Sequence, residues 1–203
     1  MRMFPLSAVL FPRGALPLHI FEPRYLAMVG DAIDGDGTFG VVLIERGSEV
    51  GGGDVRFDVG TVARIVNAGF IDDERMAVMA VGSQRIRIDE WVTEDPYPQA
   101  IVSDHPQSEA AEDLAGPVDA AWRSWRRLAA LASELGANVG AVDMELPDDA
   151  VDALWTLCAL APLEQIDRQR LLELSDPVER ANRLCSGLDE RALMLEARLA
   201  GDI

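Results

Sequence analysis

The residue types that most often carry out catalysis are scarce in this chain. Its histidines are His19 and His105, and all 18 of its cationic side chains are arginines, so lysine is absent. Without lysine there can be no Schiff-base lysine, no Ser-Lys dyad and no GxxxxGK[ST] phosphate-binding loop. Neither histidine has a second His or a Cys at ligand spacing, and no serine lies in a GxSxG turn. We therefore predict no catalytic residue, no metal site and no cofactor.

Two glycine-containing segments could be mistaken for ligand loops. The segment that begins at Asp34-Gly35-Asp36 has an acid at the twelfth position, Glu45, as a calcium loop does, but Phe39 stands where that loop needs glycine. The run Gly51-Gly52-Gly53 has no GxGxxG spacing and no helix pattern after it that could bind a phosphate. We interpret the first as a turn and the second as a loop tip.

Charge, cysteine content and apolar run length limit the kinds of partner and the cell compartment that we expect. The formal net charge is −17, and the one basic-aromatic cluster, Trp122 to Arg127, lies among many carboxylates, so we expect no nucleic-acid binding. Cys158 and Cys185 are too few for a disulfide framework and indicate reduced thiols in a cytoplasmic protein. No apolar run approaches the roughly 20 residues that span a bilayer, so we expect no membrane contact.

The first half of the chain has the pattern of short strands. Apolar runs alternate with turn residues, among them Pro12-Arg13-Gly14 and Gly82-Ser83, and one helix is expected from Pro23. The expected strands are 3–6, 15–20, 39–44, 57–66, 70–71, 76–81, 84–88 and 99–103. Since closure hides sheet edges, we expect a mostly antiparallel barrel.

The second half is helical. Apolar residues spaced by four and three run from Leu114 to Leu135, where Gly136 supplies a C-cap. Further helices are expected from Pro147-Asp148-Asp149, from Pro162, and from Asp176, whose side chain caps the last one. Short connections between four helices predict a bundle. The polar segment 104–108 separates the two patterns, which predicts domains 1–104 and 108–203.

One stretch is more specific than these patterns. Phe4-Pro5-Leu6, Val9-Leu10-Phe11-Pro12 and Leu16 to Tyr25 resemble the opening of the Lon N-terminal, or substrate-binding, domain. Similar segments follow in the same order along the chain: 39–44, 59–65, 82–88, 97–100, 146–149 and 168–173. The last departs at Arg168, where many relatives have a lysine.

The resemblance implies an α+β fold, namely a PUA-like antiparallel β pseudo-barrel with one short helix followed by an α-helical bundle. It also implies a stand-alone recognition module, because the ATPase and peptidase parts of a Lon protease would come after this region.

The function that follows is non-catalytic recognition of unfolded or tagged polypeptides, linked to protein quality control through a separate protease or chaperone. Within the motif, Phe21, Glu22, Arg24 and Tyr25 are the candidate peptide-binding residues. Each also has a structural interpretation, since Glu22 and Arg24 can pair or cap the helix and Tyr25 can pack it on the barrel.

Two alternatives remain open at this point. PUA-like barrels can bind RNA, and the family name alone would suggest an ATP-dependent peptidase. The net charge of −17 argues against the first, and the absence of lysine argues against the second.

Overall fold

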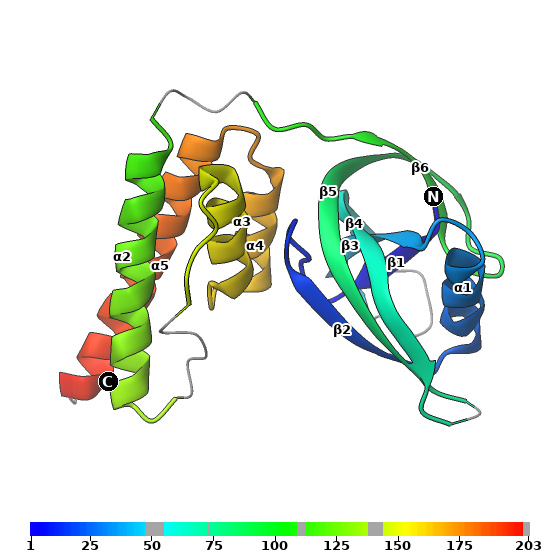
Figure 1. Cartoon of the computed structure of the whole chain (residues 1–203), viewed down its shortest axis with the longest axis horizontal. Coiled ribbons are helices and arrows are strands. Elements are labelled where there is room, and N and C mark those ends of the chain that lie inside the picture. Colours follow the sequence, from blue (N-terminus) through cyan, green and yellow to red (C-terminus); the bar gives the residue numbers. More distant parts are fainter. Residues whose placement is uncertain (48–54, 73, 109–112, 138–143, 201–203) are drawn as a thin grey trace. The chain divides into compact units, whose positions relative to one another are not determined.

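The computed structural model of the chain describes residues 1–47, 55–72, 74–108, 113–137 and 144–200, and the predicted loop tip at Gly51 to Gly53 lies outside them. The α+β fold is confirmed, with six strands and five helices in the described residues (Figure 1). In order they are β1 (Met3–Leu6), β2 (Ala15–Ile20), α1 (Pro23–Ile33), β3 (Thr38–Arg46), β4 (Val55–Phe70), β5 (Met76–Thr93), β6 (Gln99–Asp104), α2 (Ala115–Glu134), α3 (Ala150–Leu160), α4 (Gln165–Glu173) and α5 (Pro177–Ala200).

The chain divides into two compact units. The first, Met1–Pro106, contains all six strands and α1, and the second, Gln107–Ile203, contains α2 to α5 (Figure 1). None of the described helices combines the length and the apolar character that crossing a membrane requires.

Strand β5 is the centre of the first unit. It pairs with β4 along most of its length, with β2 through its first half and with β6 through its second half. The sheet order is β1-β3-β4-β5-β2, so β1 and β2 are the two ends of the path. An isolated bridge between Arg2 and Gln99 and a 2.8 Å bond from the Met3 N–H to the Pro98 carbonyl connect the N-terminus to β6. Strand β2 has no such second partner among the described residues.

One strand pair differs from the antiparallel expectation. Strand β1 runs parallel to β3, with Met3 opposite Gly40. Parallel neighbours need a long crossover connection, and the segment between them supplies one, since it contains β2 and α1.

The predicted turn at Gly82-Ser83 is wrong, because both residues lie inside the continuous strand β5. The glycine is needed for close approach instead of for a turn. A Cβ atom at Gly82 would lie 2.1 Å from the Phe11 carbonyl oxygen, far inside van der Waals contact. The Gly82 N–H donates to the Gly14 carbonyl at 2.9 Å, so this approach also anchors the start of β2 on β5.

Helix α1 closes one apolar core of the β unit. Three of its buried side chains, Tyr25, Met28 and Val29, pack with Phe4, Phe39 and other strand residues in a single cluster. Pro23 stands in the first turn as predicted, where its missing N–H costs nothing.

The helical unit confirms the local signals for where helices begin and end. Gly136 has φ of +79° and its N–H donates to the Ser133 carbonyl at 2.9 Å, as expected of a C-cap. Asp149 accepts the Asp152 N–H at 2.9 Å, and Asp176 accepts the Val178 N–H at 2.8 Å, so both act as N-caps. Helices α2 and α5 lie side by side (Figure 1). The middle of each predicted apolar stripe is buried, including Val118, Ala121, Trp125 and Leu128 of α2 and Ala181, Leu188 and Ala192 of α5, whereas Leu135 and Leu199 at the ends are exposed.

A buried arginine that no sequence pattern indicated joins three of these helices. Arg180 of α5 is fully buried, and its guanidinium lies 3.9 Å from the centroid of the Trp155 ring on α3. It donates to the Leu171 carbonyl at 3.1 Å, to the Leu174 carbonyl, and to Gln107 Oε1 at 2.7 Å. Burial lowers the pKa of Arg180 to about 10, so the side chain stays protonated at neutral pH.

We expect Arg180→Ala to lower the free energy of unfolding by about 3 kcal/mol or more, because it leaves buried carbonyls without donors and opens a cavity. Arg183→Ala, one turn further along α5 at an exposed position, is the matched control and should change stability by no more than about 0.5 kcal/mol. Urea unfolding followed by circular dichroism measures both. Equal effects of the two substitutions would contradict the assigned role of Arg180.

Candidate functional site

A cleft opens in the β unit between the two strands that end the sheet path. Its volume is about 230 Å³, and its walls come from β1, from β2, and from the turn that leads into α1. The lining residues are Phe4, Leu6, Pro17, Leu18, His19, Ile20, Phe21, Glu22 and Tyr25. A cleft of this size accommodates one or two side chains and is too small for a drug-sized ligand, which needs about 300 Å³ or more.

The floor of the cleft is apolar and fixed. The Phe4 and Tyr25 rings stack with centroids 4.1 Å apart, and the Phe39 ring lies 6.1 Å from that of Phe4. Tyr25 is only 3% exposed. Because these rings also belong to the core cluster of the unit, the floor is held in place by the packing of the fold itself.

The rim of the cleft carries an exposed aromatic ring. Phe21, in the short link between β2 and α1, is 58% exposed. A second exposed ring, that of Phe70, lies at the same end of the sheet and is 68% exposed. Its position follows from the strand register, because Phe70 of β4 lies opposite Met76 of β5, and Met76 lies opposite Ile20 of the cleft. Exposed aromatic side chains next to an apolar hollow are typical of a surface that receives another apolar group.

Glu22 and Arg24 form an ion pair beside the cleft. Arg24 Nε lies 3.0 Å from Glu22 Oε2, and the Arg24 guanidinium lies 4.5 Å from the centroid of the Tyr25 ring. Of the two structural interpretations of this pair, the mutual ion pair is present, and Glu22 makes no side-chain bond to the helix end. The pair therefore places the Arg24 guanidinium over the Tyr25 ring.

The candidate peptide-binding residues are therefore brought together. Phe21, Glu22 and Tyr25 line the cleft, and Arg24 borders it through Glu22. Their contact with polypeptide stays a prediction. Sequence reasoning missed the walls contributed by β1 and β2, which include Phe4 and Leu18. Proline inside the strand-like run 16–20 was the available signal, because proline in a sheet is confined mainly to edge strands.

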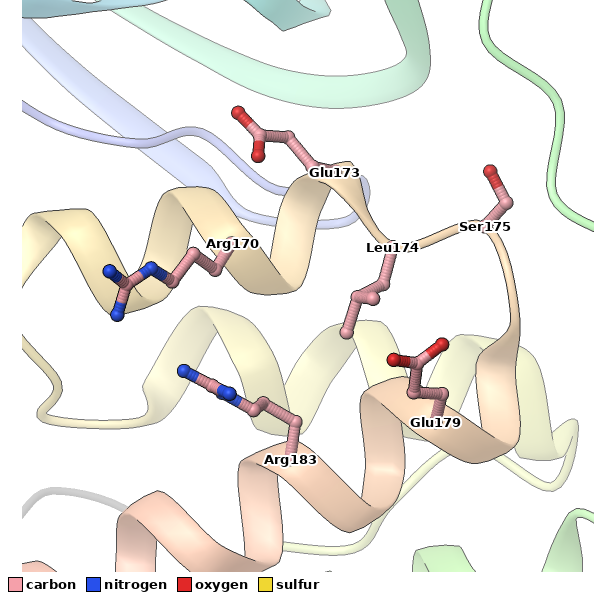
Figure 2. Close-up of a pocket in the computed structure, with 6 residues that line it drawn as sticks. All are labelled: Arg170, Glu173, Leu174, Ser175, Glu179 and Arg183. Atoms are coloured by element: carbon pink, nitrogen blue, oxygen red, sulfur yellow. The ribbon is translucent and has the colours of Figure 1, made fainter.

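A second cleft, of about 630 Å³, lies between α4 and the start of α5 in the helical unit (Figure 2). Arg170 and Arg183 lie toward one end of it, Glu179 lies near the other, and Leu174 projects between the two walls (Figure 2). Two arginines and two glutamates line it together with Leu174 and Ser175, so its formal charges cancel. This cleft has no net charge with which to select an ion.

In the helical unit, Cys158 is buried and Arg168 is hydrogen-bonded to backbone carbonyls. Burial raises the pKa of the Cys158 thiol to about 12, so it is not ionised at neutral pH. Arg168 donates to the carbonyls at the end of α3, including that of Ala161 at 2.8 Å, which is a structural role for this side chain. Among the described residues, no three His, Cys, Asp or Glu side chains are grouped to hold a metal ion.

Comparison with known proteins adds a sequence relationship to this geometry. The family described as the ATP-dependent protease La (LON) substrate-binding domain matches residues 1–190. A Lon protease of Cytophaga hutchinsonii is 30% identical over 204 residues, and Lon protease 2 of Herpetosiphon aurantiacus is 29% identical over 197 residues. These matches cover 95% and 94% of this chain but only 24% of either relative, so the chain spans about a quarter of their length.

Two solved structures share the fold. The crystal structure of a Lon N-terminal domain protein from Xanthomonas campestris is 26% identical, with a TM-score of 0.66 over 92% of this chain and 96% of the other. The N-terminal domain of a Mycobacterium avium complex Lon protease is 19% identical, with a TM-score of 0.69 over 93% of this chain and 97% of the other, and shows likeness in fold alone.

Two aromatic residues of the cleft should differ sharply in their effect on stability. We expect Tyr25→Ala to cost about 3–5 kcal/mol, since it empties a buried, stacked position. Phe21→Ala should change stability by no more than about 0.5 kcal/mol, because the ring is mostly exposed. Urea unfolding of the two variants checks this, and a large loss for Phe21→Ala would mean that Phe21 serves the fold.

The two thiols should also differ. At pH 8, iodoacetamide should modify half-buried Cys185 at least about a hundredfold faster than buried Cys158, whose raised pKa and burial suppress the thiolate. Mass spectrometry of peptides after timed quenching gives both rates. In denaturant the rates should converge, and fast native labelling of Cys158 would contradict its burial.

Proposed function

The chain belongs to the family of ATP-dependent protease La (LON) substrate-binding domains, and we propose that it binds polypeptide at the cleft between β1, β2 and α1. The observation that carries the proposal is the combination of a fixed apolar floor, Phe4 stacked on Tyr25, with the exposed Phe21 at the rim. An apolar side chain of a bound polypeptide would fill the hollow, and Phe21 would close over it. Folded proteins keep such side chains buried, so this site favours unfolded segments.

The proposal is one of binding without catalysis. The sequence contains no lysine for a Ser-Lys dyad or a phosphate-binding loop, and the cleft itself is lined by apolar residues, one histidine and one glutamate already paired with Arg24. A binding module of this kind supports protein quality control if it passes bound clients to a separate protease or chaperone. The low cysteine content suits a cytoplasmic setting.

The size of the cleft sets the expected affinity. Burying a single Phe or Leu side chain contributes about 1.5–3 kcal/mol, and a dissociation constant of 1 mM corresponds to about 4 kcal/mol. Exposed flanking contacts at Phe21 and Phe70 add to this. We therefore expect dissociation constants between about 10 μM and 1 mM for single apolar segments.

Fluorescence anisotropy with short labelled peptides rich in Leu, Phe and Val tests the proposal. Phe21→Ala should weaken binding about five- to thirtyfold, as expected for loss of about 1–2 kcal/mol. Ile101→Ala is the matched control, because Ile101 is similarly exposed, at 53%, but lies on β6 outside the cleft.

Two results would overturn the proposal. One is the absence of saturable binding by the wild-type protein at peptide concentrations up to about 1 mM. The other is an equal loss of affinity in Phe21→Ala and Ile101→Ala, which would place binding away from the cleft.

A further inference from the structure

The cleft lies beside a strand edge whose backbone groups can be assigned from the register. Gly82 donates its N–H to the Gly14 carbonyl, and β2 continues in register with Leu16 opposite Ala80 and Leu18 opposite Val78. In an antiparallel pair, alternate residues face the partner strand. The even-numbered residues of β2 therefore bond to β5, and the odd-numbered residues turn their N–H and carbonyl groups to the opposite edge.

This outer edge presents a defined set of donors and acceptors. Ala15 and His19 each offer an N–H and a carbonyl, whereas Pro17 offers a carbonyl only. The side chains of these three residues are exposed, and Leu18 and Ile20 point to the apolar side that forms the cleft. A proline at the middle position limits uncontrolled strand pairing, as edge strands commonly do.

The facing strand β1 is a much poorer template. Its Phe4 lies opposite Val41 of β3, and the Gly40 N–H donates to the Arg2 carbonyl, so the even-numbered residues of β1 face β3. On the other edge, Met3 already donates its N–H to the Pro98 carbonyl and Pro5 has no N–H. Between the two end strands, only β2 keeps backbone donors that face the cleft.

We propose that a bound polypeptide adds as an extended strand to the outer edge of β2, hydrogen-bonding to Ala15, Pro17 and His19 while an apolar side chain fills the cleft. This inference rests on the proposed function and specifies how the same site holds its client. Main-chain bonding of this kind is independent of the client's side chains, so it suits a module that receives many sequences. Because the cleft beside β2 holds an apolar side chain, each bound segment then needs one apolar residue at that position.

The negative net charge of the chain favours some polypeptide segments over others. With a net charge of −17, the protein repels acidic segments and attracts basic ones, and this long-range effect acts mainly on the association rate. We therefore assign the edge to an extended apolar segment with neutral or basic flanks.

Peptides methylated on backbone nitrogens test the inference with the wild-type protein. In a strand bound to β2, alternate amides face the edge, so N-methylation at one set of alternate positions should weaken binding more than about tenfold. Methylation at the other set should leave the dissociation constant within about twofold. A peptide that binds with no such alternation overturns strand addition and leaves binding at the cleft intact.

Variants of His19 test the same bond from the protein side. His19→Pro and His19→Ala both lack the imidazole, but only His19→Pro also lacks the outward N–H. Since that N–H is not part of the β2–β5 ladder, both variants should fold. His19→Pro should bind the peptide about five- to tenfold more weakly than His19→Ala, and equal affinities would overturn the inference.

Sedimentation analysis tests whether a client polypeptide or a second copy of the chain occupies the outer edge of β2. If two copies of the chain pair through β2, the wild-type protein is a dimer that peptide dissociates and His19→Pro is a monomer, and this result would replace the client with a second copy. If neither the peptide nor His19→Pro changes the oligomeric state of the protein, this result supports the proposal that the edge binds a client. If no peptide binds at all, the proposed function fails together with strand addition. If a peptide binds without the expected alternation, only strand addition fails.

Discussion

The β unit depends on the backbone hydrogen bonding of β5, because this strand holds three others in place. Strand β4 follows it along most of its length, and β2 and β6 divide its other edge between them. Just beyond the last β2 pair, at Val81, the chain passes very close to Phe11 at Gly82, where any side chain would collide with a carbonyl oxygen. The start of β2, and with it one wall of the cleft, is anchored by that approach.

Since β6 takes the second half of β5 and β2 takes the first, the sheet path ends at β1 on one side and at β2 on the other. The cleft is the gap between these ends, floored by rings that the fold buries for its own stability. Side chains that build the core and side chains that stay exposed thus lie within a few residues of each other. Tyr25 belongs to the core, whereas Phe21, four residues earlier, contributes mainly exposed surface.

The helical unit shows a different kind of constraint. Three of its helix ends have local caps, Gly136, Asp149 and Asp176, each of which depends on residues within one turn. The buried Arg180 joins three of the helices, because it stacks on Trp155 of α3 and donates to carbonyls at the end of α4. Burying a charge is costly unless every donor is bonded, so this contact requires one relative arrangement of these helices.

Much of the fold was predictable because its signals are local. The caps, the first-turn Pro23 and the four-and-three spacing of α2 and α5 were identified correctly from neighbouring residues alone. Gly82 was misassigned to a turn, because glycine serves turns and close approaches alike and only the distant Phe11 decides between them. Arg180 was not singled out at all, since an arginine on a helix is usually exposed and its burial depends on three other segments.

The two structural halves, the absence of lysine-dependent chemistry and the family of the chain follow from the residues alone. The sequence also pointed to Phe21, Glu22, Arg24 and Tyr25, which lie within five consecutive residues. The folded chain was needed to show that Phe4 stacks on Tyr25, that β2 is left with an outward edge, and which of its amides face that edge. Caps and periodicity act over a few residues, whereas stacking, register and edge position depend on which distant strands pair.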